Sequence, residues 1–165
     1  MPDHIEHLLV EYRTEGVLVD TNLLLLYVVG VYEPHRIERF KRTSTFTTED
    51  FELLKRLLGH FETVATTPPV LTEVSNFLGH LPKEARRNRT GLLRRLIPEL
   101  EERHHPSSEI CKHPYFRQFR LTDTGIAEAS EGTYLVVTDD LPLYHALAND
   151  QQAVINFSHL RTANW

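Results

Sequence analysis

The chain has 165 residues, of which 41% are hydrophobic and 25% are charged, which is typical of one globular domain with a buried core. Its formal net charge of −5 excludes binding to nucleic acid through an overall positive charge, and its single cysteine excludes an internal disulfide framework. We therefore expect a single domain over residues 1–165 in a reducing, cytoplasmic compartment, with Cys111 as a small filler residue.

The N-terminal half of the chain alternates between helical and strand-like patterns. An amphipathic helix is predicted at the start, ended by Gly16, and "VLVD" (17–20) has the continuous apolar character of a buried parallel strand. A helix over 23–32 follows, capped by Thr21 or Asn22. The next predicted elements are a helix over 47–61 that begins with a capping threonine, a strand over 63–67 and a helix over 68–78 that begins with prolines.

The C-terminal half continues the alternation after a less regular middle. Residues 82–105 are predicted to be mostly helical with a kink at Pro98, whereas residues 106–120 match no element. The remaining pattern predicts a helix from 121–130, a strand over 133–138, a helix over 139–150 and a strand over 153–157. Strands that alternate with helices predict an α/β fold with a parallel sheet.

The most apolar segment, residues 16–32, is predicted to be buried core rather than a membrane span. Asp20 and Asn22 interrupt it, and the side chains of a membrane-spanning helix are almost all apolar. The charged N-terminus also lacks the apolar stretch of a signal peptide. No membrane partner is therefore expected.

Acidic residues follow the predicted strands in a consistent way. Asp20 directly follows the first strand, and Asp139 and Asp140 directly follow the strand "YLVVT". Glu73 lies one helical turn beyond the strand "TVATT", and Asp123 opens the helix before "YLVVT". Because the carboxyl ends of parallel strands meet at one edge of a sheet, we expect these acids to converge there.

A cluster of carboxylates at one edge requires a compensating charge. Neighbouring carboxylates raise one another's pKa values and destabilise the fold unless a cation offsets them, and oxygen ligands suit Mg²⁺ or Mn²⁺. Such an ion activates water and stabilises the charge that develops on a phosphodiester. For each acid taken alone, a helix cap is the simpler interpretation; only the set indicates a metal site.

At these positions the sequence resembles the PIN-domain nuclease family. The matching stretches, in the order that the family has them, are "VLVDTNLLL", "TTPPVLTEVSNFL", "LTDTGIAEAS" and "LVVTDDLPLY". The resemblance implies a three-layer α/β/α sandwich with a central parallel sheet. It also implies a Mg²⁺- or Mn²⁺-dependent ribonuclease that uses a cluster of acidic residues. Extra residues around 31–46 and 101–120 depart from the shorter, toxin-type members of the family.

The resemblance assigns roles to individual residues. It implies that the catalytic and metal-binding acids are Asp20, Glu73, Asp123 and Asp140. Asp139 occupies the variable position of the final motif, from which it would contact the metal through water. Polar residues that would orient the carboxylates, with helix capping as the alternative, are Thr21, Asn22, Asn76 and Thr138.

Basic residues are concentrated in two segments despite the negative net charge. The segment 35–42 carries Arg36, Arg39, Lys41 and Arg42, and the segment 83–95 carries six more cationic residues. The residues expected to hold an RNA backbone are Arg86, Arg87, Arg89 and Arg94, with a solvated helix face as the alternative. His159 and Arg161 follow the last strand, and we interpret them as ordinary tail residues rather than phosphate ligands.

Three functions are compared. The leading hypothesis is a metal-dependent ribonuclease, with the toxin of a toxin–antitoxin pair as a subtype; a cognate antitoxin and a homodimer are open by resemblance. A haloacid-dehalogenase-like phosphatase needs a second aspartate two residues after the first, where this chain has Asn22. The alternative function is a catalytically inert PIN-like module that binds RNA or protein.

Overall fold

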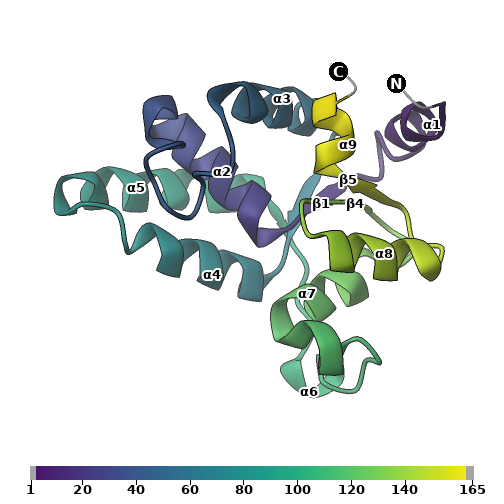
Figure 1. Cartoon of the computed structure of the whole chain (residues 1–165). Helices are drawn as coiled ribbons and strands as arrows, with labels where there is room; N and C mark the ends of the chain where they lie inside the picture. The colour runs from purple at the N-terminus through teal and green to yellow at the C-terminus, as the bar shows by residue number, and fades with distance from the viewer. Residues whose placement is uncertain (1–2, 163–165) are drawn as a thin grey trace.

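The computed structural model describes residues 3–162, without the side chains of 83–87 and 89. It is an α/β/α sandwich around a five-stranded, all-parallel sheet of order β3-β2-β1-β4-β5 (Figure 1). The strands are β1 (Val17–Val19), β2 (Val64–Thr66), β3 (Glu101–Glu102), β4 (Leu135–Thr138) and β5 (Val154–Asn156). The predicted fold class is thereby confirmed.

Helices connect the strands and cover the sheet. Those before β3 are α1 (Asp3–Glu11), α2 (Thr21–Tyr32), α3 (Thr48–Leu58), α4 (Pro68–Leu78) and α5 (Lys83–Leu96), with short 3-10 turns η1 (Pro34–Arg36) and η2 (Ile97–Glu99). Those after β3 are α6 (Ser107–Ile110), α7 (Phe116–Ser130), α8 (Leu141–Asn149) and α9 (Phe157–Thr162). Figure 1 shows α2, α4 and α5 on one side of the sheet and α7 and α8 on the other.

The neighbouring strands β1 and β4 form the switch point of the sheet. The chain leaves β1 through α2 and α3 toward β2, and it leaves β4 through α8 toward β5, in the opposite direction. Right-handed crossovers then place α2 and α8 on opposite faces. In α/β sheets, ligands bind beyond the carboxyl ends of the strands at such a reversal. Asp20 and Asp139 follow these two strands.

The core is built around β1, β4 and α2. All residues of the two strands are buried, as continuous apolar runs in a central parallel sheet should be. The four leucines that begin α2 are buried as well, and Gly30 of α2 lies directly against the ring of Phe51 on α3. A Cβ atom at Gly30 would overlap that ring, so the glycine permits the close approach of the two helices. None of the helices in residues 3–162 is both long enough and apolar enough to cross a membrane.

The structure corrects the predicted helix over 82–105. Helix α5 ends at Leu96, Pro98 lies in η2, and Glu101–Glu102 form the edge strand β3 beside β2. Contacts from distant residues hold this strand: the Tyr134 hydroxyl donates to Glu101 Oε1 (2.5 Å), and the Arg103 amide donates to the Thr66 carbonyl (2.8 Å). A two-residue strand of glutamates has no apolar pattern to reveal it.

Three local predictions are also corrected. Helix α2 is capped by Asp20, whose Oδ1 accepts from the Leu23 amide (2.9 Å), rather than by Thr21 or Asn22. Residues 106–120, for which no element was predicted, contain α6 and the first turn of α7. Cys111 is exposed, with its Sγ 3.4 Å from the Ser108 carbonyl, so it is not a filler of the core.

Candidate active site at the switch point

Asp20 ties the carboxyl end of β1 to that of β4. Its side chain is buried, and its Oδ2 accepts hydrogen bonds from Thr138 Oγ1 (2.5 Å) and from the Asp139 amide (2.9 Å). Burial raises the pKa of Asp20 to about 8; the negative charge of Asp139 adds to the effect, and the hydrogen bonds oppose it. The protonated form is therefore favoured near neutral pH unless a cation compensates the charge.

Glu73 joins three helices through two threonine hydroxyls. Thr21, the first residue of α2, donates to Glu73 Oε2 (3.0 Å), and Thr122 of α7 donates to Oε1 (2.7 Å). Glu73 itself lies in the second turn of α4 and is half-buried. Its carboxylate is thus held in one orientation at the carboxyl edge of the sheet.

Asp123 lies close enough to Asp140 and to Glu73 for their charges to interact with its own. Burial, together with the negative charges of Asp140 and Glu73, raises the pKa of Asp123 to about 6. Asp140 caps α8, its Oδ1 accepting from the Leu143 amide (2.8 Å), and its own amide donates to Thr138 Oγ1 (2.9 Å). The negative charges of Asp140 and Glu73 thus disfavour the ionised form of Asp123.

The acids form two groups rather than one closed cage. Asp20 interacts with Asp139, whose Oδ1 accepts from the Asn22 amide group (3.1 Å), and Asp123 interacts with Asp140 and with Glu73. Within residues 3–162, no three His, Cys, Asp or Glu side chains are arranged to hold one metal ion. Their oxygens suit a hard cation such as Mg²⁺, which commonly takes one or two carboxylates and keeps several waters. The donor chemistry fits such an ion, whereas a three-carboxylate cage is not preformed.

Two clefts reach the acids from different directions. One, of about 620 Å³, is lined by Glu73 and Asp123 together with His104, His105 and Arg120. The other, of about 860 Å³, is lined by Asn22 and Asp139 and by a group of basic side chains, Arg36, Arg39, Lys41, Arg42 and His80. We call the second one the basic cleft. Thr21 and Asn22, adjacent in the chain, connect Glu73 to Asp139, so the polar network runs from one cleft to the other.

Some predicted site residues lie outside this network. Asn76 is exposed, and its side chain does not hydrogen-bond to any acid in the described part of the chain. Arg94 is exposed on α5 and lines neither of the two clefts. The side chains of the other predicted RNA-binding residues, Arg86, Arg87 and Arg89, lie outside the described residues.

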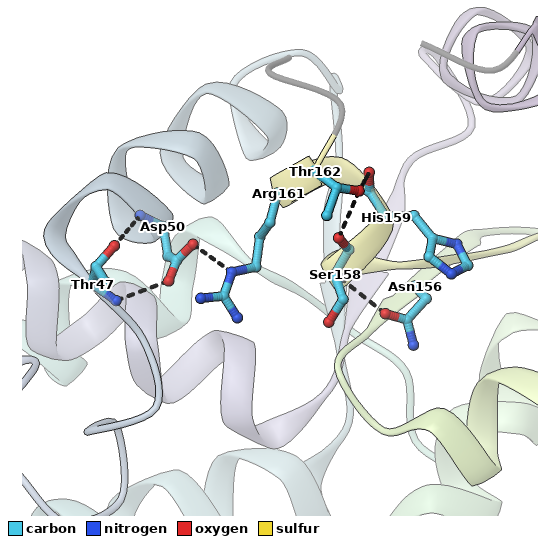
Figure 2. A network of polar contacts seen from close by, with 7 residues as sticks. All are labelled: Thr47, Asp50, Asn156, Ser158, His159, Arg161 and Thr162. Atoms are coloured by element: carbon cyan, nitrogen blue, oxygen red, sulfur yellow. Dashed lines mark hydrogen bonds and ion pairs between the residues drawn. The ribbon is translucent and has the colours of Figure 1, made fainter.

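The two C-terminal candidates have structural partners. Arg161 extends from α9 toward α3, where its Nε lies 2.7 Å from Asp50 Oδ1 (Figure 2). His159 packs edge-on against the ring of Tyr144. These contacts agree with the interpretation of both as tail residues rather than phosphate ligands.

Sequence reasoning missed two parts of this site. Thr122 was not assigned a role, although it stands next to Asp123 in the motif "LTDT" and orients Glu73. The basic segment 35–42 was recognised as a cluster, but nothing in its pattern placed it beside Asp139. Both depend on contacts between segments that are far apart in the chain.

Comparisons of the chain with models of protein families, with curated proteins and with solved structures found no match. The functional interpretation therefore depends on the chemistry of the site. That chemistry combines acids held at the switch point, raised pKa values of Asp20 and Asp123, and a basic cleft that Asn22 and Asp139 help to line.

Proposed function

We propose that this chain is a divalent-metal-dependent ribonuclease of the PIN-domain type. Its catalytic and metal-binding residues would be Asp20, Glu73, Asp123 and Asp140, with Asp139 contacting the metal through water. The observation that supports this most is that acids from four separate segments are held at one end of the sheet, although burial and repulsion raise the pKa values of Asp20 and Asp123. A divalent cation would remove that penalty.

The protein groups around the acids would position them for this chemistry. Thr138 and the Asp139 amide hold Asp20, while Thr21 and Thr122 hold both oxygens of Glu73. Asp123 accepts no hydrogen bond from any described residue, so both of its oxygens are available to a cation. Bound Mg²⁺ or Mn²⁺ would supply an activated water and stabilise the negative charge on the phosphodiester.

An aspartyl-phosphate mechanism fits the site less well. It needs a general acid two residues after the nucleophile. Asn22 stands at that position, and an amide cannot transfer a proton to a leaving group; its amide group instead donates a hydrogen bond to Asp139. An inert module that binds RNA or protein is the remaining alternative. In such a module, the buried carboxyl groups of Asp20 and Asp123 would disfavour the ionised form of the folded protein without serving a chemical function. The choice of RNA as substrate, a cognate antitoxin and a homodimer follow from the family resemblance.

The test is RNA cleavage in the presence of Mn²⁺, combined with calorimetric titration of the ion. We expect Mn²⁺-dependent cleavage by the unmodified chain and its loss to background in Asp123→Asn, because the variant removes a charged oxygen that no protein group uses. Glu131→Gln is the matched control, since Glu131 is exposed and outside both clefts.

Two results would contradict the proposal. The first is the absence of Mn²⁺ binding at millimolar concentration together with the absence of cleavage, which would favour the inert module. The second is equal cleavage by the unmodified chain and by Asp123→Asn after both have been shown to be folded by circular dichroism.

A further inference from the structure

We infer that the basic cleft is a binding site for the phosphate backbone of single-stranded RNA, separate from the acids that would cut it. The inference rests on the proposed function for the identity of the strand, but the cleft itself is defined by the structure. It has a volume of about 860 Å³, and its basic side chains come from the segment between α2 and α3 and from the turn after α4.

The segment that carries these cations is anchored to the body of the protein. Ile37 and Phe40 are buried, and the Thr43 hydroxyl donates to the Ile37 carbonyl (2.8 Å), which closes the loop on itself. Figure 1 shows this connection between α2 and α3 folding back beside α2. The basic side chains between the anchors are therefore presented from a fixed backbone, which lowers the entropy lost when a ligand binds.

Two of the four cations are already engaged, and two have no ionic partner. Arg36 Nε donates to Glu33 Oε2 (2.7 Å), and the Arg42 guanidinium lies over the Phe77 ring, 4.2 Å from its centroid. Arg39 and Lys41 are exposed, and neither has an ion-pair partner among the described residues. Unpaired cations that line a concave surface attract anions.

The acids near the cleft cancel only part of this charge. Glu33 is paired with Arg36, and Glu38, in the same segment, is exposed and does not line the cleft. Asp139 also lines the cleft, and the Asn22 amide group donates to its carboxylate. The lining thus carries four permanent positive charges, one of them paired with Glu33, and one carboxylate.

This arrangement favours a nucleic-acid strand over other anions. Guanidinium groups match the geometry of phosphates, and a groove with several separated cations can follow a backbone that repeats its charge. A strand bound by Arg39 and Lys41 would share the cleft with Asn22 and Asp139, and the contact of the neighbouring Thr21 with Glu73 connects this cleft to the other acids. An acidic polypeptide would use the cations but would gain nothing from the nearby acids.

The experiment measures RNA binding without cleavage. A fluorescein-labelled single-stranded 12-nucleotide RNA is titrated with protein in EDTA at several salt concentrations, and binding is followed by fluorescence anisotropy. For Arg39→Ala/Lys41→Ala we expect binding weakened on the order of tenfold at low salt. The slope of log K against log salt should become shallower by about 1.4, because each lost phosphate contact contributes ~0.7 for a single strand.

A matched variant and a second anion serve as controls. Lys112→Ala/Arg117→Ala removes the same charge from exposed positions outside the basic cleft, and we expect it to leave both affinity and slope unchanged. Polyglutamate of equal charge should bind at least about tenfold more weakly than the RNA. Thermal unfolding followed by circular dichroism checks that both double variants are folded.

The outcomes separate this inference from the proposed function. RNA cleavage with Mn²⁺ but unchanged RNA binding by folded Arg39→Ala/Lys41→Ala would overturn the inference and leave the ribonuclease proposal in place. Loss of RNA binding in that variant without any cleavage by the unmodified chain would support the inference and contradict the ribonuclease proposal. Equal affinity for polyglutamate and RNA would overturn the assignment of the cleft to RNA.

Discussion

Asp20 combines a structural role with the proposed chemical one. Its Oδ1 caps α2 and its Oδ2 joins the ends of β1 and β4, so the residue helps to align the two strands of the switch point. The same burial that makes these bonds effective raises its pKa. In the absence of a cation, an ionised carboxylate in this position destabilises the folded state. Protonation of Asp20 should therefore change the free energy of unfolding measurably.

We predict that the metal-free protein loses stability as the pH rises from about 4 to 8. The folded-state pKa of Asp20 is about 8, above its ordinary value of 3.8, and burial also raises the pKa of Asp123 to about 6. The folded chain therefore binds more protons than the unfolded chain in this range. The stability gained from this proton binding is fully present only below the ordinary pKa of 3.8 and is lost as the pH rises through the folded-state pKa of about 8. Urea unfolding at a series of pH values in EDTA measures the effect.

Asp20→Asn provides the comparison for this pH dependence. The variant cannot ionise at this position, so its free energy of unfolding should fall less steeply with pH than that of the unmodified chain. Millimolar Mn²⁺ at pH 8 should restore stability to the unmodified chain more than to the variant, because a ligand that binds only the folded state stabilises it. Identical pH slopes in the two proteins would contradict the raised pKa of Asp20.

At the scale of secondary structure, the contact between α2 and α3 is set by a glycine inside a helix. Replacement of Gly30 by alanine should lower the free energy of unfolding by about 1–3 kcal/mol, since the added methyl group overlaps the buried Phe51 ring.

Gly91→Ala is the matched control: Gly91 also lies inside a helix, α5, but is exposed and has no atom within 4 Å of an added Cβ. That variant should gain about 0.5–1 kcal/mol from helix propensity alone. Chemical denaturation of both variants measures these changes. A higher free energy of unfolding in Gly30→Ala would contradict the close packing of Gly30 against Phe51.

Helix α7 has an interruption that places site residues. Arg120 has φ 61° and ψ −158°, a backbone region in which residues other than glycine are strained, typically by about 1–3 kcal/mol. Beyond this point the helix restarts, and its first turn carries Thr122 and Asp123 toward Glu73. This interruption explains why the sequence pattern predicts a helix only from residue 121, because periodicity does not continue through a change of direction at Arg120.

At the scale of the whole molecule, α9 is attached to α3 by one ion pair between segments over a hundred residues apart. Asp50 completes the capping box of α3 with Thr47, and its Oδ1 also meets Arg161 (Figure 2). The Asp50 side chain is 8% exposed, so the charge has little access to water. The C-terminal helix thereby closes against the first half of the chain.

Arg161→Ala is expected to destabilise the protein by about 1–3 kcal/mol, because it leaves a buried carboxylate without its cationic partner. Lys55→Ala on the same helix, α3, removes a pair whose side chains are 57% and 50% exposed, and it should change stability by less than about 0.5 kcal/mol. Thermal unfolding of the two variants tests the difference. Equal effects would mean that the burial of Asp50 does not strengthen its pair.

Features encoded within a short stretch of chain were predicted correctly. The continuous apolar runs of β1 and β4, the prolines that begin α4 and the threonine that caps α3 each act through neighbours in the chain, so their pattern identifies them. The position of Asp20 and Asp140 at strand ends follows from the same local patterns. Parallel strands then bring both acids to one edge by topology alone.

What only the tertiary structure decided depends on contacts between distant segments. The edge strand β3 exists because it pairs with β2 and because Tyr134 binds Glu101. Thr122 becomes a partner of Glu73 through the interruption of α7. Arg39 and Lys41 come to line a cleft that Asp139 also lines. The sequence by itself determined the α/β alternation and the edge at which the acids gather, because these follow from local periodicity and the handedness of the crossovers. The division of the acids into two groups came from packing, because the direction of each side chain is set by neighbours that no local pattern specifies.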